Sequence, residues 1–266
     1  ERGILIKDAE SLELARKVNV VVLDKTGTIT EGKPVVTHLT WLEGTDNEKS
    51  ALFSLEKQSE HPLAEAMVTF LTGASLLPVA DFVSITGKGV KGQMAGKTYY
   101  AGSISLMHEN NISIDNTLAT DAATWAAESR TVVWFADSAK ALAVAAIADQ
   151  VRQTSVEAVR QLQQAGIEVH MLTGDSASTA KLIAQAVGIS HYQAEVLPEG
   201  KAAYVRQLQA SGKTVAMVGD GINDSTALAQ ADVSVAMGKG SDIAMDVAKM
   251  TIISSDLTKL PDAIRL

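Results

Sequence analysis

Apolar and polar positions follow two different rhythms along this chain. Residues 20–23 form an apolar, largely β-branched run that ends abruptly in Asp24, and we predict a strand over 18–23 that is buried on both faces of a parallel sheet. Beyond Asp149, helical and extended segments alternate regularly. We predict helices over 156–165, 178–187 and 200–210, and strands over 167–172, 214–218, 233–236 and 251–253. This alternation predicts an α/β fold in which helices cover both faces of a parallel sheet. The domain is discontinuous in sequence, because both ends of the chain contribute strands to this sheet.

The middle of the chain has a different order of elements. Gly32, Lys33 and Pro34 interrupt the first pattern. After them, the spacing of apolar residues predicts helices over 47–58, 63–71 and 115–128, and strands over 79–85, 89–94, 98–101, 131–136 and 141–147. Such a mixture indicates an α+β domain inserted on two hinges. We therefore expect one domain over residues 1–36 and 148–266, and an inserted domain over residues 37–147.

Composition supports folded cores and excludes some functions. The chain has 266 residues, of which 46% are hydrophobic, enough for one large domain or two of ordinary size. The net charge of -8 argues against nucleic-acid binding, which favours a basic face. There is no cysteine, so disulfides and thiolate metal ligands are excluded within the chain. The longest unbroken apolar run, 141–148, is far below the roughly 20 residues that cross a bilayer, and we expect no signal peptide.

Candidate chemistry gathers in three loops that each follow a predicted strand, at residues 24–28, 173–175 and 219–224. Right-handed crossovers bring the carboxyl ends of parallel strands to one edge of the sheet, where open α/β sheets bind their ligands. The loops offer carboxylates, hydroxyls and backbone N–H groups, and Lys201 offers a cation. Phosphoryl transfer needs mainly positioning and charge neutralisation, so we expect it at this edge, with Asp24 as the nucleophile.

The residue two positions after Asp24 distinguishes two kinds of enzyme. A phosphatase with an aspartyl nucleophile uses a second acid there, which protonates the leaving group and then activates water. This chain has Thr26 at that position. An acyl phosphate on Asp24 should therefore persist, which suits energy coupling better than simple hydrolysis. A soluble phosphatase with an inserted cap domain stays open as an alternative, and so does a nucleotide sensor without catalysis.

The segment Asp24-Lys25-Thr26-Gly27-Thr28-Ile29-Thr30 resembles the phosphorylation motif of the P-type ATPases, and the later motifs make the chain similar to their heavy-metal-transporting (type IB) branch. The resemblance implies a haloacid-dehalogenase-like, doubly wound phosphorylation domain and an inserted nucleotide-binding domain. It implies that Asp24 accepts the γ-phosphoryl of MgATP to drive export of a heavy-metal ion. We expect the chain to be the large cytoplasmic loop of such a pump.

The resemblance also implies roles for single residues. Mg²⁺ would be held by Asp24, Asp220 and the backbone carbonyl of Thr26, because a hard cation prefers oxygen ligands. Thr173, Gly174 and Lys201 would hold or neutralise the phosphoryl oxygens, and Asn223 and Asp224 would support the metal shell and these oxygens. Further catalytic residues would be Lys25, Thr26 and Asp175. Thr226 departs from the family pattern, which has a proline there, and we expect weaker rigidity at the start of the following helix.

The predicted insert carries the nucleotide signal. Residues 59–64, Ser-Glu-His-Pro-Leu-Ala, resemble the Ser-Glu-His-Pro motif of heavy-metal pumps, in which the histidine, here His61, contacts adenine or orients the nucleotide. Glu56 matches the adenine-contacting glutamate of the family. Gly87 and Gly89 form a glycine pair that lets the backbone approach the phosphates. Ser103 stands where the family often has asparagine, and it can donate a single hydrogen bond.

The resemblance places the remaining partners outside this chain. They are the membrane helices and the actuator domain of the same pump, so we expect the chain alone to be a monomer that hydrolyses ATP slowly, at the cytoplasmic face of the cell membrane. The histidines show no paired ligand spacing, so the transported ion would bind elsewhere: they are His38, His61, His108, His170 and His191. Residues 241–248 resemble copper pumps slightly more than zinc pumps.

Overall fold

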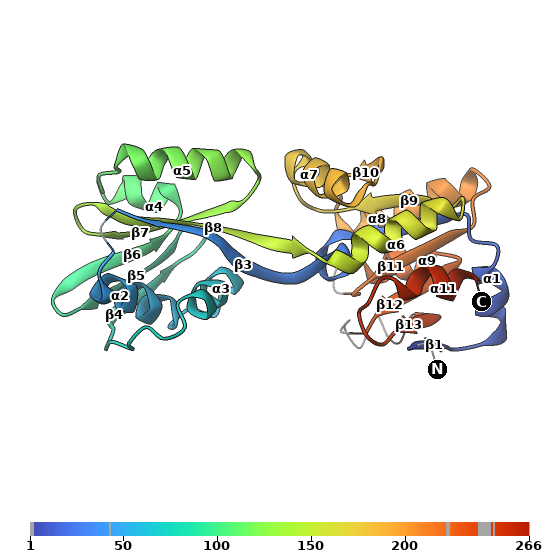
Figure 1. The fold of residues 1–266 in the computed structure, drawn as a ribbon, viewed down its shortest axis with the longest axis horizontal. Coiled ribbons are helices and arrows are strands. Elements are labelled where there is room, and N and C mark those ends of the chain that lie inside the picture. The colour runs from blue at the N-terminus through green and yellow to red at the C-terminus, as the bar shows by residue number, and fades with distance from the viewer. Residues whose placement is uncertain (1–2, 43, 222–223, 239–245, 247, 266) are drawn as a thin grey trace. The chain divides into compact units, whose positions relative to one another are not determined.

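The computed structural model describes residues 3–42, 44–221, 224–238, 246 and 248–265. The chain divides into two compact units (Figure 1). Unit 1 consists of Glu1–Gly32 and Gln150–Leu266, and unit 2 of Lys33–Asp149. These divisions lie within a few residues of the boundaries that the sequence suggested.

Unit 1 is built on a seven-stranded sheet with the order β1-β13-β12-β11-β2-β9-β10. Neighbouring strands are parallel, except that β1 is antiparallel to β13. The strands are β1 (Ile4–Ile6), β2 (Val20–Asp24), β9 (Glu168–Leu172), β10 (His191–Gln193), β11 (Val215–Gly219), β12 (Val233–Met237) and β13 (Met250–Ile252). The helices are α1 (Ala9–Ala15), α6 (Gln153–Gln164), α7 (Ala177–Val187), α8 (Pro198–Ala210), α9 (Ser225–Gln230) and α11 (Lys259–Arg265). The predicted discontinuous α/β sheet is confirmed.

The central strand β2 is buried along its whole length, and its side chains alternate between two apolar layers. Val21 and Leu23 pack with buried residues of α6, α7 and α11, whereas Val20 and Val22 pack with those of α8 and α9. Full burial of one such side chain contributes about 1.5–3 kcal/mol to stability. Both faces of the sheet are therefore covered, and the carboxyl end of β2 is held at the centre of the sheet.

Unit 2 contains a six-stranded sheet with the order β3-β8-β7-β6-β5-β4. Its strands are β3 (Thr30–Trp41), β4 (Ala80–Ile85), β5 (Gly89–Met94), β6 (Lys97–Gly102), β7 (Thr131–Asp137) and β8 (Ala141–Val151). Helices α2 (Asp46–Glu56) and α3 (Pro62–Phe70) cover one face, and α4 (Ile104–Glu109) and α5 (Asn116–Ala127) cover the other (Figure 1). Phe135 on β7 packs toward α2 and α3, and its neighbour Trp134 packs toward α4 and α5. Unit 2 is therefore an α+β insert, as the sequence predicted, with two helices on each face of one sheet.

The structure contains elements that the sequence pattern missed. Strand β3 continues through Pro34, where we predicted a break. The proline is tolerated because β3 is an edge strand, so one missing N–H donor costs little pairing. Helix α4 has 6 residues and strand β10 has 3. Both elements are too short to show a periodic pattern of apolar residues.

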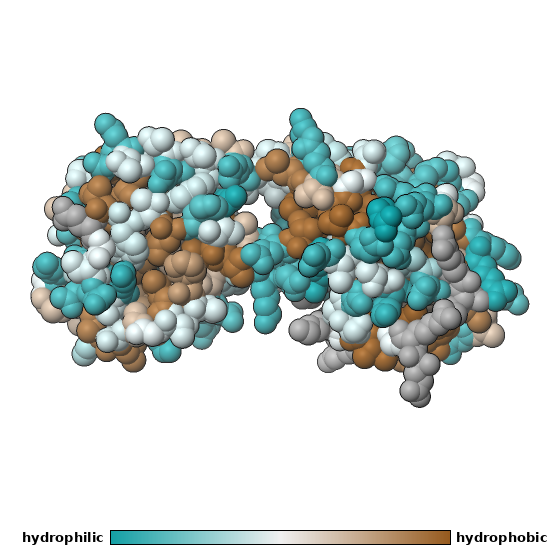
Figure 2. Space-filling view, viewed as in Figure 1, coloured by the Kyte–Doolittle hydropathy of each residue, from teal (hydrophilic) through white to brown (hydrophobic). Residues whose placement is uncertain are grey.

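The face of each unit seen in Figure 2 mixes polar and apolar side chains. Leu197 is 70% exposed and Ile253 is 62% exposed, but isolated apolar residues are ordinary on protein surfaces and mark no interface alone. Among the helices that the structure describes, none combines the length and the apolar character that crossing a bilayer requires.

Replacing Leu162 with alanine should lower the free energy of unfolding by about 2–5 kcal/mol, because this α6 side chain is fully buried and its removal leaves a cavity. Leu182 on α7 is 42% exposed, so Leu182→Ala is a matched control that should cost less than about 1 kcal/mol. Urea unfolding followed by circular dichroism measures both variants. Equal costs would contradict the assignment of Leu162 to the core.

Candidate functional site

The three predicted loops of unit 1 meet at the carboxyl edge of its sheet. Asp24 ends β2 in register with Leu172 at the end of β9, and the adjacent strand β11 ends at Gly219. Residues of these loops line a cavity of about 340 Å³. The predicted residues in its lining are Asp24, Thr26, Thr173, Gly174, Asp175, Lys201 and Asp220. Residues 195–198, which the sequence analysis did not single out, complete this lining.

A buried ion pair lies at the centre of this site. The Nζ atom of Lys201, in the first turns of α8, is 2.5 Å from Oδ1 of Asp24. Asp24 is 5% exposed and Lys201 is 4% exposed. Burial raises the pKa of Asp24, while the attraction and hydrogen bond of Lys201 oppose the rise. Lys201 therefore favours the ionised carboxylate that a nucleophile needs.

Asp224 is a second carboxyl group in this environment, and it is fully buried. Burial raises its pKa to about 7, repulsion from Asp24 and Asp220 adds to the rise, and Lys201 opposes it. Its Oδ1 accepts a hydrogen bond of 2.7 Å from the N–H of Gly221. A Cβ on Gly219 would lie 1.6 Å from Oδ2 of Asp224, so only glycine leaves room for this carboxyl. The predicted residue Asn223 lies outside the described residues.

A second ion pair connects the loop after β2 with the loop after β9. The Nζ atom of Lys25 lies 2.7 Å from Oδ2 of Asp175, and the side chain of Lys25 is 10% exposed. The hydroxyl of Thr173 accepts a hydrogen bond of 3.1 Å from the N–H of Asp175. Lys25 and Asp175 thus hold two loops together, which is a positioning contact that spacing in the sequence could not reveal.

Arg152 is a site residue that the sequence analysis missed. Its guanidinium lies 3.0 Å from Oε2 of Glu31 and donates to the carbonyl oxygens of Gly27, at 3.4 Å, and Glu31, at 3.3 Å. The hydroxyl of Ser155 donates to the carbonyl of Ile29 at 2.9 Å. These contacts hold the turn η1 (Lys25–Ile29), which follows Asp24. Arg152 and Glu31 are 121 positions apart, so no local pattern signals their contact.

Thr226 lies in the first turn of α9, which begins at Ser225. Its hydroxyl donates to the carbonyl oxygen of Pro198 at 3.5 Å and so links α9 with α8. A proline at this position would preset the helical φ angle but would lose this link.

The donors at this edge of the sheet suit Mg²⁺. A Cβ on Gly27 would lie 2.8 Å from Oδ2 of Asp220, so this carboxylate closely approaches the loop after Asp24. Oδ2 of Asp224 is buried without a hydrogen-bond partner among the described residues. The described part of the chain contains no group of three or more acidic or histidine side chains arranged for a metal. Mg²⁺ needs none, because it is commonly held by one or two carboxylates, water and substrate phosphates.

The predicted nucleotide-site residues line one cavity of unit 2. Its volume is about 520 Å³, and it opens between α2, α3 and the strands β4 to β7. The lining includes Glu56, His61, Gly87, Gly89 and Ser103.

Two residues of this cavity are also helix caps. Nδ1 of His61 accepts a hydrogen bond of 3.2 Å from the N–H of Leu63 at the start of α3, which orients the ring and leaves the proton on Nε2. The hydroxyl of Ser103 accepts from the N–H of Leu106 at 3.4 Å and pairs with Ser105 at 2.8 Å. Contact of Ser103 with a nucleotide stays a prediction.

The glycines of this cavity have a structural reason of their own. A Cβ on Gly89 would lie 2.1 Å from the carbonyl oxygen of Ala101, and one on Gly102 would lie 2.1 Å from that of Lys88. Strands β5 and β6 thus approach too closely for any side chain at either position. Gly87 has a φ of +71° and open space around it, so the turn conformation explains this glycine. Contact of Gly87 and Gly89 with phosphates stays a prediction.

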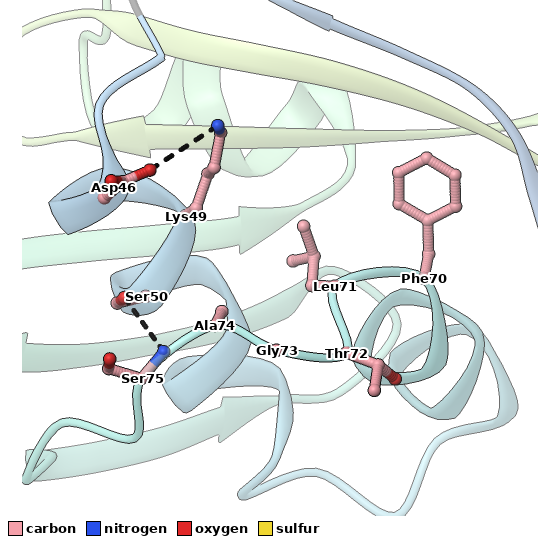
Figure 3. Close-up of a pocket in the computed structure, with 9 residues that line it drawn as sticks. All are labelled: Asp46, Lys49, Ser50, Phe70, Leu71, Thr72, Gly73, Ala74 and Ser75. Carbon is pink, nitrogen blue, oxygen red and sulfur yellow. Dashed lines mark hydrogen bonds and ion pairs between the residues drawn. The ribbon is translucent and has the colours of Figure 1, made fainter.

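Another cavity of unit 2, of about 430 Å³, lies between α2 and the segment after α3 (Figure 3). Within it Lys49 pairs with Asp46 at 3.7 Å, and Ser50 accepts from the N–H of Ser75 at 3.2 Å. The N-terminus of α2 is already capped by Thr45 and Glu48. These polar groups are satisfied within the protein, and we assign this cavity no function.

Comparison with known proteins agrees with this geometry. The family model of haloacid dehalogenase-like hydrolases matches residues 18–232. A probable copper-transporting ATPase, PacS of Synechococcus elongatus, is 48% identical over 100% of this chain and 36% of its own length. A probable copper-importing P-type ATPase of Enterococcus hirae is 45% identical over 99% of this chain and 36% of its own length. The chain thus spans little more than a third of these relatives.

Solved structures show the same similarity. A zinc-transporting PIB-type ATPase superposes with a TM-score of 0.88 at 30% identity, over 99% of this chain and 43% of that protein. The catalytic domain of a CPx-ATPase, CopB-B, superposes with a TM-score of 0.77 at 30% identity, over 100% of this chain and 96% of that domain.

The chain belongs to the haloacid dehalogenase-like hydrolases, as the match over residues 18–232 shows. Within that class its relatives are P-type ATPases, so the resemblance to the heavy-metal-transporting branch is confirmed. The end-to-end match with a solved catalytic domain favours an ATPase over the soluble phosphatase that the sequence left open.

Replacing Lys201 with methionine should lower the free energy of unfolding by about 3–5 kcal/mol, because it leaves the buried carboxylate of Asp24 without its cation. The double variant Asp24→Asn/Lys201→Met should recover part of this loss, since it removes the unpaired charge. Lys181→Met on the exposed side of α7 is the matched control. Denaturant unfolding measures all three; a Lys201→Met variant as stable as the control would show that the pair contributes nothing.

Proposed function

We propose that this chain is the ATP-binding and autophosphorylating part of a heavy-metal P-type ATPase. Unit 1 would be its phosphorylation domain, and unit 2 its nucleotide-binding domain. One observation carries the proposal: a buried aspartate ends the central parallel strand, faces a cavity and is paired with a buried lysine. This arrangement supplies a nucleophile and a cation at the place where phosphoryl transfer needs them.

The proposed reaction is a direct displacement at phosphorus. A carboxylate oxygen of Asp24 forms a bond to the γ-phosphorus of ATP, and the bond from that phosphorus to the β–γ bridging oxygen breaks. ADP leaves with the electron pair of that bond. Lys201 would neutralise charge on the transferring oxygens, while Thr173 and Gly174 would donate a hydroxyl and backbone N–H to them.

Asp24, Asp220 and the backbone carbonyl of Thr26 would hold Mg²⁺, which would supply positive charge between the phosphates and the acidic edge. Asp224, with its pKa raised to about 7, can hold a proton near neutral pH and so limit the negative charge of this edge. The ion pair of Lys25 and Asp175 would hold the loops after β2 and β9 together. Asn223 would support the metal shell and the phosphoryl oxygens, as predicted.

The acyl phosphate should be durable, because Thr26 stands where a phosphatase has its second acid. Hydrolysis would then need a base from the actuator domain, outside this chain. In the proposed pump, the membrane helices and the transported ion would lie outside this chain. This part of the pump would lie at the cytoplasmic face of the membrane. Copper is the proposed ion because the two relatives described above have copper in their names. One is named as copper-importing and the other as copper-transporting, so the direction of transport stays a prediction.

In the full-length pump, γ-labelled ATP should give an acid-stable, hydroxylamine-sensitive label on Asp24, because an acyl phosphate has these properties. Asp24→Asn should abolish the label while nucleotide binding persists. Retention of the label in Asp24→Asn, or its absence from the wild-type pump, would refute the proposal.

The isolated chain should hydrolyse ATP far more slowly than the complete pump, because it lacks the actuator loop that supplies the base for dephosphorylation. A phosphate-release assay of both proteins at equal concentration and saturating MgATP measures the difference. A turnover by the chain equal to that of the pump would instead favour a self-sufficient hydrolase.

A further inference from the structure

Glu56 is a buried acid without a counter-charge. It is the last residue of α2, lines the 520 Å³ cavity of unit 2 and is 6% exposed. No described residue forms an ion pair or a hydrogen bond with its carboxyl group. Apolar side chains such as Leu63, Val90 and Val133 share the cavity wall with it. An ionised carboxylate is costly in such a place, because it gives up its hydration without a partner.

The charged groups around Glu56 do not change this picture. Helix α3 and strands β5 and β6 pack against α2. The titratable side chains on these elements, beside α2 and in the cavity wall are Asp46, Glu48, Lys49, Lys57, His61, Glu65, Lys88, Lys91, Lys97, Tyr99 and Tyr100. Burial alone raises the pKa of Glu56 to about 7. Lys88, the one lysine or arginine in the wall of this described cavity, is instead paired with Glu109 at 2.8 Å.

A neutral carboxyl group and a carboxylate recognise different ligands. The neutral acid presents an O–H donor beside a carbonyl acceptor, whereas the carboxylate presents two acceptors. Adenine offers an amino donor at N6 beside the acceptor N1, which matches the neutral acid. Guanine offers adjacent donors at N1 and N2, which match the carboxylate. The protonation state of one side chain can therefore decide which base is preferred.

We propose that Glu56 binds the nucleotide as a neutral carboxylic acid, and that its proton selects adenine over guanine. The proposal rests on the proposed function, because it assumes that this cavity receives the base. It makes Glu56 a specificity-determining residue whose donor is lost on ionisation. Affinity for ATP should therefore fall as the pH rises, while affinity for GTP should not.

The size of the effect follows from the titration of a single group. The protonated fraction of an acid with a pKa of about 7 falls from about nine tenths at pH 6 to about one tenth at pH 8. If only the neutral acid binds adenine, the dissociation constant for MgATP rises about tenfold over this interval.

Titration calorimetry of the full chain with MgATP and MgGTP, at pH 6 and pH 8, tests the proposal. Glu56→Gln is the informative variant, because its amide keeps a donor beside an acceptor at every pH. It should bind MgATP at both pH values about as tightly as the wild type at pH 6. Glu65→Gln, at an exposed position of α3, is the matched control and should lose affinity with rising pH as the wild type does. Titration of the nucleotide itself cancels in these comparisons.

The melting temperature, measured without nucleotide, reports on the proton independently of binding. A carboxyl whose pKa is raised by folding stabilises the fold at low pH, and this stability is lost as the pH rises from about 4.5 to about 7. The melting temperature of Glu56→Gln minus that of the wild type should therefore be higher at pH 8 than at pH 6. For Glu65→Gln this difference should not rise.

Three outcomes decide the matter. A tenfold pH effect on ATP that Glu56→Gln removes would support the proposal. A wild-type affinity for ATP that does not change with pH, or a Glu56→Gln variant that binds ATP more than tenfold more weakly than the wild type at pH 8, would overturn it and leave the proposed function intact. Absence of ATP binding by every folded variant at both pH values would overturn the proposed function as well.

Discussion

The contact between Asp24 and Lys201 is the interaction on which the site of unit 1 depends. A parallel sheet gathers the ends of its strands at one edge, and here that edge carries Asp24, Asp220 and Asp224. Each carboxylate taken out of water costs several kcal/mol unless a cation or hydrogen bonds compensate. Lys201 supplies the cation from α8. Burial, and after it repulsion from Asp24 and Asp220, nevertheless raises the pKa of Asp224 to about 7.

The two units surround their buried carboxyl groups differently. In unit 1 burial raises the pKa of Asp24, and Lys201 at 2.5 Å opposes the rise and so favours the ionised carboxylate. In unit 2 Glu56 is buried to a similar extent, but no described residue offers it a cation, and burial holds its proton near neutral pH. Two buried carboxyl groups of one chain therefore differ in whether a cation opposes the effect of burial. Local environment, rather than residue type, sets this difference.

Several motif residues have structural roles. His61 caps α3, Ser103 caps α4, and Gly89 allows the close approach of two strands. Gly219 leaves the space that Asp224 occupies. A substitution at one of these residues would therefore alter the backbone that shapes a cavity.

The sequence by itself determined the α/β fold, the α+β insert and the loops that meet at one sheet edge. These features follow from short-range signals: the period of apolar residues, a polar stop after Leu23, and turn residues between elements. It also grouped Glu56, His61, Gly87, Gly89 and Ser103, which line one cavity. Its failures were an edge strand that tolerates Pro34 and elements too short to show a period.

Only the tertiary structure decided which groups are paired and which are not. Arg152 reaches Glu31 across 121 positions, Lys201 reaches Asp24 across 177, and Lys25 pairs with Asp175. It likewise showed that no described residue pairs with Glu56. Such contacts depend on how strands and helices from distant parts of the chain pack, and neither periodicity nor a motif encodes the distance between two side chains or the water that burial removes.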